Sequence, residues 1–211
     1  MSKVLLITSS PRGEASHSSR VARALADRLA SGDPKSTVTV RDLFKEPLPH
    51  IGEHFVSALF APPENHTPAQ SEAVALSDRL IAELFAADVI VIASAMINFG
   101  ISSTLKTYID YILRKGVTFR YTEKGPEGLV KGKKVYIVRA SGGVYSEGDL
   151  KPLNFQDPYL KLVLGFIGIT DVETIHIEGI AYGPEATDKA LTAAAARVAT
   201  VAPHQATGLA A

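Results

Sequence analysis

The chain has 211 residues, in which 22 Lys and Arg residues balance 22 Asp and Glu residues, and it contains no cysteine. This length predicts one domain or at most two, and the zero formal net charge argues against a dominant electrostatic surface for nucleic acid or an anionic membrane. The lack of cysteine excludes disulfide frameworks, thiolate nucleophiles and cysteine-ligated zinc or iron–sulfur centres.

The first 30 residues predict a buried strand followed by a helix. Residues 4–7 (VLLI) form a continuous apolar run, as in strands covered on both faces. This run is too short for the apolar core of a signal peptide, and the longest apolar run, at 89–97, is about half of what a membrane helix needs. Apolar residues then recur at helical spacing over 16–29. We expect a cytoplasmic protein.

The rest of the chain repeats this alternation of strand and helix patterns. Prolines between residues 43 and 66 predict a long connection with one helical turn near 55–60, and Thr67 followed by Pro68 predicts a helix N-terminus. The remaining strands are predicted at 37–42, 88–94, 133–140 and 172–177. The remaining helices are predicted at 67–85, 101–113, 158–167 and 184–200. We expect a single domain at 1–201 and a frayed tail at 202–211.

Strands separated by helical crossovers predict an α/β fold, with an open five-stranded parallel sheet and helices on both faces. The polar strand at 37–42 suits an edge of this sheet. Such sheets bind ligands beyond the carboxyl ends of the strands, where the strand order reverses. The candidate site therefore lies in the loops after strands one, three and four, at residues 9–18, 94–101 and 140–147.

The first loop places the hydroxyls of Ser10, Ser16 and Ser18 where a buried strand leads into a helix. These hydroxyls, backbone N–H groups and the helix dipole would converge on one point, as a site for a terminal phosphate requires. The loop has neither the G-x-G-x-x-G pattern of pyrophosphate sites nor a P-loop lysine. The alternative is that the serines only cap the helix and turn the chain.

The second loop combines apolar faces with one amide. Asn98 offers a donor and an acceptor, and its neighbours Met96, Ile97 and Phe99 are apolar. This combination suits a planar heteroaromatic ring with a polar edge. The alternative is a strand end and a helix cap, with Met96 and Phe99 in the core.

The third loop begins Ser141-Gly142-Gly143. Two glycines after a buried strand let a backbone approach a ligand closely and expose its N–H groups. Donors aimed at one ring edge would stabilise negative charge there. The alternative is a plain turn.

One further motif has the spacing of a zinc peptidase. His50, Glu53 and His54 match H-x-x-E-H, a pattern that needs both histidines on one helix. Pro49 and Gly52 oppose a stable helix there. We therefore expect a solvated loop and no metal centre.

Long stretches of the chain resemble the FMN-dependent NADH-azoreductases, which are flavodoxin-like quinone reductases of bacteria. The resemblance runs from Ser2 to about Val201 and is densest in the first strand and serine loop and at 67–84, 116–134 and 164–185. It implies a three-layer flavodoxin-like fold with strand order 2-1-3-4-5. It also implies that FMN is tightly bound and that NADH or NADPH is the electron donor. It further implies a homodimer in which the partner chain completes each site. We expect residues 48–60 to contribute to the partner's site, because their apolar side chains have no evident core partner.

The resemblance also implies roles for individual residues. The FMN phosphate would be held by Ser10, Ser16, His17 and Ser18. The ribityl chain and the isoalloxazine ring would be bordered by Met96, Ile97, Asn98 and Phe99. The pyrimidine edge would lie near Ser141, Gly142 and Gly143, with the glycines donating backbone N–H groups. The substrate would lie against Phe99 and Tyr121.

At three positions the chain departs from the family pattern. Ile97 stands where a tyrosine is frequent, Ser141 where an arginine is frequent, and Val163 where a phenylalanine is common. We expect these departures to alter substrate preference.

The implied function is the reduction of quinones to hydroquinones and the reductive cleavage of aromatic azo compounds, by ping-pong two-electron hydride transfer through the flavin. Neither nucleic acid nor a membrane is an expected partner. The alternative is a flavodoxin-type electron carrier that binds FMN without its own turnover. Such carriers are usually strongly acidic and lack the long insert at 116–130, unlike this neutral chain. Phosphodiester hydrolysis would need a base and a metal cluster, for which the sequence offers no candidates.

Overall fold

The computed structural model describes residues 1–204, and their main sheet is parallel, with the strand order β2-β1-β3-β6-β7. Its strands are β1 (Lys3–Thr8), β2 (Thr37–Asp42), β3 (Val89–Ala95), β6 (Lys134–Ala140) and β7 (Asp171–Ile177). A separate antiparallel hairpin joins β4 (Phe119–Thr122) to β5 (Gly125–Gly128). The predicted order 2-1-3-4-5 is confirmed, because predicted strands four and five are β6 and β7.

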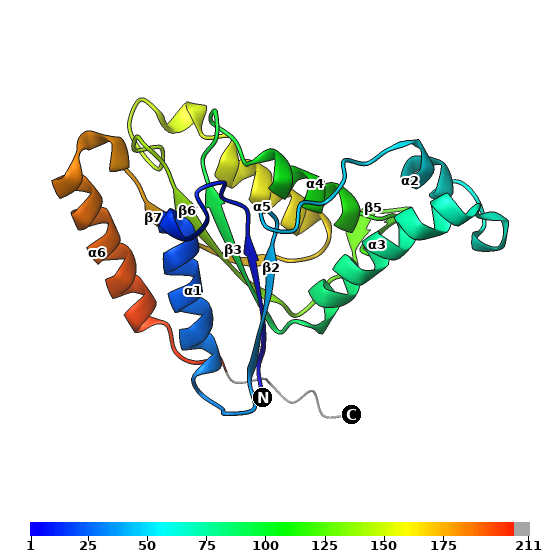
Figure 1. Cartoon of the computed structure of the whole chain (residues 1–211), viewed down its shortest axis with the longest axis horizontal. Helices are drawn as coiled ribbons and strands as arrows, with labels where there is room; N and C mark the ends of the chain where they lie inside the picture. The colour runs from blue at the N-terminus through cyan, green and yellow to red at the C-terminus, as the bar shows by residue number, and fades with distance from the viewer. Residues whose placement is uncertain (205–211) are drawn as a thin grey trace.

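Helices cover both faces of this sheet and make the fold three-layered (Figure 1). One face carries α1 (His17–Ala30) and α6 (Pro184–Thr200). The other carries α3 (Pro68–Ala86), α4 (Ser103–Ile112) and α5 (Gln156–Phe166). The short α2 (Glu53–Ala58) packs on α3 at one end of the molecule. The predicted helices are therefore confirmed, with small shifts of their ends.

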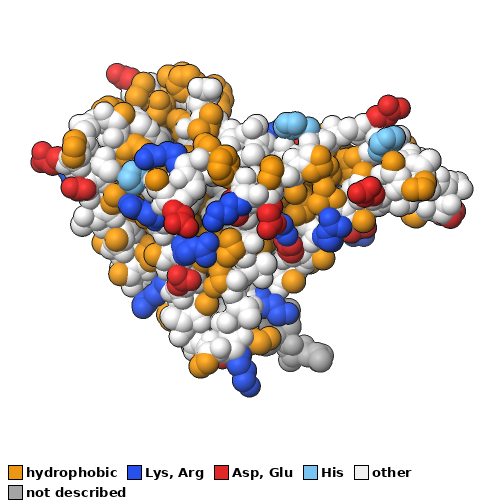
Figure 2. Space-filling view, viewed as in Figure 1, with side chains coloured by type: hydrophobic (Ala, Val, Ile, Leu, Met, Phe, Trp, Pro, Cys, Tyr) orange, Lys and Arg blue, Asp and Glu red, His pale blue; other side chains and the backbone are white. Residues whose placement is uncertain are grey.

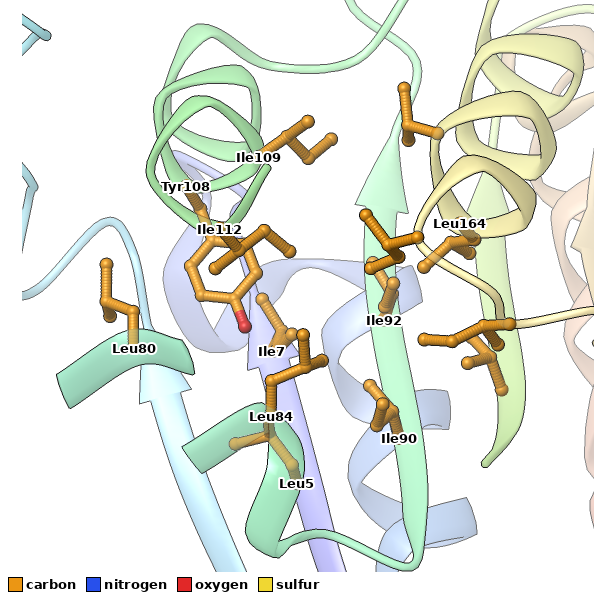
Figure 3. Packing of buried hydrophobic residues seen from close by; sticks show 14 of the residues in the cluster. Leu5, Ile7, Leu80, Leu84, Ile90, Ile92, Tyr108, Ile109, Ile112 and Leu164 are labelled. Carbon is orange, nitrogen blue, oxygen red and sulfur yellow. The ribbon is translucent and has the colours of Figure 1, made fainter. Parts of the chain in front are cut away.

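Two apolar clusters, one on each face, hold the layers together. Because successive strand residues point to opposite faces, β1 sends Leu5 and Ile7 into the cluster under α3, α4 and α5, and Val4 and Leu6 into the cluster under α1 and α6. Figure 3 shows the first cluster, in which Tyr108 of α4 packs among the aliphatic side chains of β1 and β3. The prediction that β1 is buried on both faces is confirmed.

Hydroxyl side chains cap the N-termini of three of the long helices. Thr67 and Gln70 form a capping box at α3, in which each side chain accepts the backbone N–H of the other residue, and Pro68 occupies the first helical position. Ser16 caps α1 and Ser102 caps α4 in the simpler way, each by accepting one N–H. The loops after β1 and β3 therefore end in ordered helix N-termini.

Two features differ from the sequence-based expectations. The β4–β5 hairpin was not predicted, and it is pinned to the end of α5, where Val130 N–H donates to Ile167 O at 2.8 Å. The residues 48–60 were expected to lack core partners, and this is wrong for Phe55. Its ring is buried and lies 4.9 Å from that of Tyr111, between ring centroids.

The described C-terminus packs against α1. His204 N–H donates to Leu29 O at 3.0 Å. Residues 205–211, the larger part of the predicted frayed tail, lie outside the described residues. Among the helices of residues 1–204, none is both long and apolar enough to cross a membrane.

Candidate functional site

The three predicted loops lie side by side at one edge of the sheet, because β1, β3 and β6 are neighbouring parallel strands (Figure 1). Thr104 Oγ1 donates to Ser9 O at 3.3 Å and joins the first loop to the start of α4, the helix that follows the second loop. Met96 N–H donates to Ala140 O at 2.8 Å and joins the second loop to the end of β6. The carboxyl ends of the central strands thus form one continuous rim.

In the first loop, three buried hydroxyls surround the start of α1. A 3₁₀ turn at Gly13–Ala15 folds the loop back, so that Ser10, Ser16 and Ser18 are all nearly inaccessible to solvent. Ser16 Oγ and Ser18 Oγ are 3.2 Å apart. The Ser10 hydroxyl accepts the Arg12 N–H at 3.3 Å. The structure therefore brings Ser16 and Ser18 together and buries Ser10 in the same folded loop.

The same loop leaves backbone donors unused. Ser16 Oγ accepts the N–H of Ser19, so the capping interpretation holds for Ser16. Among the hydrogen bonds of residues 1–204, none takes the N–H of Ser10, His17 or Ser18. Free N–H groups at a helix N-terminus, beside buried hydroxyls, form a favourable environment for an anion.

Unpaired cations add to this positive environment. Arg12, Arg20, Arg23 and Lys45 make no ion pair within residues 1–204. Burial and the charges of Arg20 and Arg12 lower the pKa of His17 below its ordinary value. Figure 2 shows Lys and Arg side chains, interspersed with Asp and Glu, over the region of α1 and β2. The positive electrostatic potential here favours the binding of an anion and disfavours the protonation of His17.

The second loop is a tight turn in an uncommon conformation. Ile97 and Gly100 exchange two backbone hydrogen bonds of 3.0 Å, and the residues between them have positive φ, 46° at Asn98 and 70° at Phe99. A left-handed backbone costs a bulky residue about 1–2 kcal/mol. The turn presents Phe99 with 45% of its surface exposed. The alternative that placed Phe99 in the core is therefore wrong, whereas Met96 is half-buried.

Two more aromatic residues border Phe99, and neither was predicted as a site residue. The Phe99 and Tyr145 rings meet edge to face, with centroids 6.3 Å apart. Phe99 O accepts the N–H of Phe155, whose side chain is exposed. Both neighbours follow β6, and their proximity to Phe99 depends on the strand order. The exposed rings of Phe99 and Phe155 and the half-buried ring of Tyr145 provide apolar surface suited to a planar ring.

In the third loop, the carbonyl groups are paired and the N–H groups are free. The carbonyl oxygens of Ser141, Gly142 and Gly143 accept N–H groups from Ile180, Ala181 and Gly179 at 3.4, 3.0 and 3.2 Å. Within residues 1–204, the N–H groups of Gly142, Gly143 and Val144 have no acceptor. Both glycines are in close contact, since a Cβ on Gly143 would lie 3.2 Å from Leu150 Cδ1. The loop is therefore an ordered donor surface and more than a plain turn.

A buried charged cluster, which the sequence did not reveal, lies behind this loop. Arg139 is fully buried on β6, pairs with Glu178, and donates to Nδ1 of His176 at 2.8 Å. Its Nε lies 3.6 Å from Asp157 Oδ2. Burial acts to raise the pKa of Glu178, but hydrogen bonds from Ser146 and Tyr145 and the Arg139 charge outweigh it and lower the pKa. The charged residue inside the apolar strand 134–140 was the available signal.

Two other predicted positions lie apart from the rim. Tyr121 is on β4, and the β4–β5 hairpin packs against Ile167 and Gly168, near the amino end of β7, whereas the three loops follow the carboxyl ends of the strands. No contact within the described residues joins Tyr121 to the three loops; it packs edge-on against Phe119. Val163 is on the buried face of α5, in the core.

The H-x-x-E-H motif does not lie on one helix. Helix α2 begins at Glu53, after His50, and His50 Nδ1 is 3.2 Å from Thr107 Oγ1. Over the described part of the chain, no group of three or more His, Asp and Glu side chains is arranged to hold a metal ion.

Comparisons with known proteins agree with this geometry. A family described as having a flavodoxin-like fold matches residues 2–202. The chain is 57% identical over 202 residues to FMN-dependent NADH:quinone oxidoreductase 1 of Rhizobium etli, covering 96% of this chain and 98% of the relative.

Solved structures are similar over the same length. An azoreductase from Bacillus anthracis strain Sterne superposes with a TM-score of 0.86 at 34% identity, over 94% of this chain and 97% of that one. An FMN-dependent NADH-azoreductase from Bacillus anthracis strain Ames Ancestor, solved in complex with FMN, gives a TM-score of 0.84 at 25% identity, over 94% and 98% of the two chains.

Proposed function

Because the chain belongs to the flavodoxin-like family that includes these quinone oxidoreductases and azoreductases, we propose that it is an FMN-dependent oxidoreductase. It would use NADH or NADPH to reduce quinones and aromatic azo compounds, as a single domain in the cytoplasm. One observation carries this proposal: three adjacent loops offer an anion site, an exposed apolar border and a row of free N–H groups. FMN has a phosphate, a planar ring and a polar ring edge.

The first loop fits the phosphate. The hydroxyls of Ser10, Ser16 and Ser18 and the free N–H groups of His17 and Ser18 would bind its oxygens. A phosphate needs several donors at once, and hydrogen bonds to charged groups are the strongest in this class. A dianion would also favour the protonated form of His17. The site is therefore selective for a phosphate monoester over an unphosphorylated flavin.

The other two loops fit the ring system. Met96, Ile97, Asn98 and Phe99 would border the ribityl chain and one part of the ring, with Ser141, Gly142 and Gly143 at its pyrimidine edge. The positive φ at Asn98 and Phe99 and the close packing of both glycines support a site shaped before the ligand arrives. FMN supplies the electron-transfer chemistry when bound, and the chain binds, orients and tunes it.

The residues around the flavin would tune its reactivity and determine where the substrates bind. Backbone N–H groups aimed at one ring edge stabilise negative charge there. The exposed ring of Phe99 leaves room for a planar donor or acceptor beside the flavin. Donor and acceptor would share this one space, so the first must leave before the second enters. Ping-pong kinetics are the expected consequence.

We also propose a homodimer in which the partner chain completes each site. Tyr121 is 63% exposed, and its hairpin packs near the amino end of β7, whereas the three loops follow the carboxyl ends of the strands, so a role beside the acceptor would call for a second copy. The exposed apolar side chains of Ile51, Val56, Leu59 and Phe60 lie in the segment expected to contribute. Contiguous exposed apolar surface is characteristic of interfaces.

The experiment is steady-state NADH oxidation by the purified chain reconstituted with FMN, with menadione or an azo dye as acceptor. We expect a yellow protein whose visible absorbance bleaches on anaerobic addition of NADH, and turnover when the acceptor is added. FMN binding without turnover would instead indicate a flavodoxin-type electron carrier. A chain that stays colourless in excess FMN would contradict the proposal.

A further inference from the structure

The segment that follows β7 holds the third loop at both of its ends. The Glu178 carboxylate accepts the Tyr145 N–H at 2.7 Å and also the Ser146 hydroxyl. The next three residues, 179–181, donate their N–H groups to the carbonyl oxygens of residues 141–143. The direction of the 141–146 backbone therefore depends on contacts with residues 178–181.

These contacts determine where the N–H groups point. In a trans peptide unit, the C=O of one residue and the N–H of the next point in opposite directions. With the carbonyls of residues 141–143 turned towards the segment after β7, the N–H groups of Gly142, Gly143 and Val144 must point away from it. None of these three N–H groups finds an acceptor within residues 1–204.

A buried counter-charge keeps Glu178 ionised. Only 10% of its side chain is exposed, and an isolated carboxylate at such a depth would be costly. The fully buried Arg139 guanidinium pairs with it, and also reaches His176 and Asp157. Arg139 comes from β6 and Glu178 from the end of β7, so the pair also joins the two strands that bracket the loop.

We propose that Glu178, held by Arg139, is a positioning residue that orients the Gly142 and Gly143 N–H groups towards the pyrimidine edge of FMN and so favours the reduced over the oxidised flavin. The inference rests on the proposed function. Reduction places additional negative charge on this edge, and oriented donors bind the more negative form more tightly. Glu178 itself would not touch the flavin.

The test is Glu178→Gln, which keeps the shape of the side chain and removes its charge. Binding of oxidised FMN and of dithionite-reduced FMN is titrated under argon, by flavin fluorescence or absorbance. We expect the dissociation constant for reduced FMN to rise about tenfold more than that for oxidised FMN, which equals a two-electron potential lower by about 30 mV. A purely structural role would weaken both forms equally.

Glu173→Gln is the matched control, because Glu173 lies on β7, the strand that leads to Glu178, away from the loop, and pairs with Arg197. It should change thermal stability without changing the ratio of the two dissociation constants. Ser146→Ala removes one hydrogen bond to Glu178 from an exposed residue and should shift the ratio in the same direction, about twofold. Ser146→Ala therefore serves as the test of the inference if the Glu178→Gln protein does not fold.

An unchanged ratio in the folded Glu178→Gln protein, or in Ser146→Ala if only that variant folds, would overturn the inference and leave the proposed function intact. A wild-type chain that binds neither form of FMN would overturn both.

Discussion

Ser16 caps α1, and we propose that it also binds the FMN phosphate; these two roles can be separated by substitution. Its hydroxyl caps the helix through Ser19 N–H and lies 3.2 Å from the Ser18 hydroxyl. Replacing Ser16 and Ser18 together by alanine should raise the dissociation constant for FMN about 100-fold, because two hydrogen bonds to a charged group are lost. Isothermal titration of the FMN-free protein measures this change.

The helix cap needs its own control. Loss of an N-cap costs about 1 kcal/mol of stability, and Thr67→Ala removes an equivalent cap at α3, away from the rim. It should lower the free energy of unfolding as much as the double variant does, without weakening FMN. Equal FMN affinity in wild type and the double variant would contradict the phosphate role.

His17 gives the FMN-free chain a pH dependence of known sign. Burial, Arg20 and Arg12 lower its pKa below 6.5, so the unfolded chain binds this proton more tightly than the folded chain. The free energy of unfolding should therefore fall as the pH drops below 6.5 and level off below the folded pKa. His17→Gln should remove this component from urea-denaturation curves.

An NMR titration tests the same residue directly. The pKa of His17 should lie below 6.5 in the FMN-free chain and rise when FMN is added, because the phosphate stabilises the imidazolium. A pKa that FMN leaves unchanged would place the phosphate elsewhere.

Phe99 combines exposure with a backbone conformation that sequence patterns do not predict for phenylalanine. Phe99→Leu keeps an apolar side chain but removes the aromatic face, so KM for a quinone should rise about three- to tenfold, while FMN affinity changes less. Phe85→Leu, at an exposed position near the end of α3, is the control and should leave KM unchanged. A larger effect on FMN affinity than on KM would contradict a substrate role.

At the scale of elements, the sequence predicts what depends on local pattern. The runs at 4–7 and 89–93 are apolar throughout, and both became central strands, while the Thr67–Pro68 signal marked the start of α3 correctly. The β4–β5 hairpin has little such pattern, since residues 119–128 are rich in charge, Gly and Pro. Its position depends on a close backbone contact with the end of α5. Local sequence patterns do not predict such a contact.

Gly128 makes that contact possible. A Cβ at this position would lie 2.0 Å from Gly168 N, so Gly128→Ala must push the hairpin away from α5. We expect a loss of about 3 kcal/mol in the free energy of unfolding, measured with urea, since overpacking against rigid backbone cannot relax. Gly52→Ala is the control, because a Cβ there meets open space. Equal stability of both variants would show that the hairpin moves freely.

In the candidate site, too, the sequence predicts the features that depend on local pattern and misses those that depend on contacts between distant residues. The serine and glycine loops were predictable because they follow apolar strands in a parallel sheet, which fixes the edge where they meet. The buried pair of Arg139 and Glu178 could not be predicted. Hydrophobic patterns assign charged residues to the surface, and these two residues are 39 positions apart in the sequence. Tyr145 and Phe155 were missed for a similar reason, since their relation to Phe99 exists only in the folded chain.

At the scale of the whole molecule, the position of Tyr121 requires an explanation. Its hairpin packs near the amino end of β7, whereas the three loops follow the carboxyl ends of the strands, and 63% of its side chain is exposed. A twofold dimer could bring the hairpin of one chain to the loops of the other. We therefore expect Tyr121→Ala to leave FMN binding nearly intact and to raise KM for a quinone or azo acceptor.

Subunit complementation tests whether that contact is made between chains. The Ser16→Ala, Ser18→Ala protein should bind FMN about 100-fold more weakly but keeps Tyr121, whereas the Tyr121→Ala protein keeps its FMN site but lacks Tyr121. After unfolding, mixing and refolding, a mixed dimer has one site in which intact loops meet an intact Tyr121. Random pairing makes half of the dimers mixed, so about one quarter of all sites should regain wild-type acceptor kinetics. Recovery no greater than the sum of the two separate proteins would show that Tyr121 acts within its own chain or not at all.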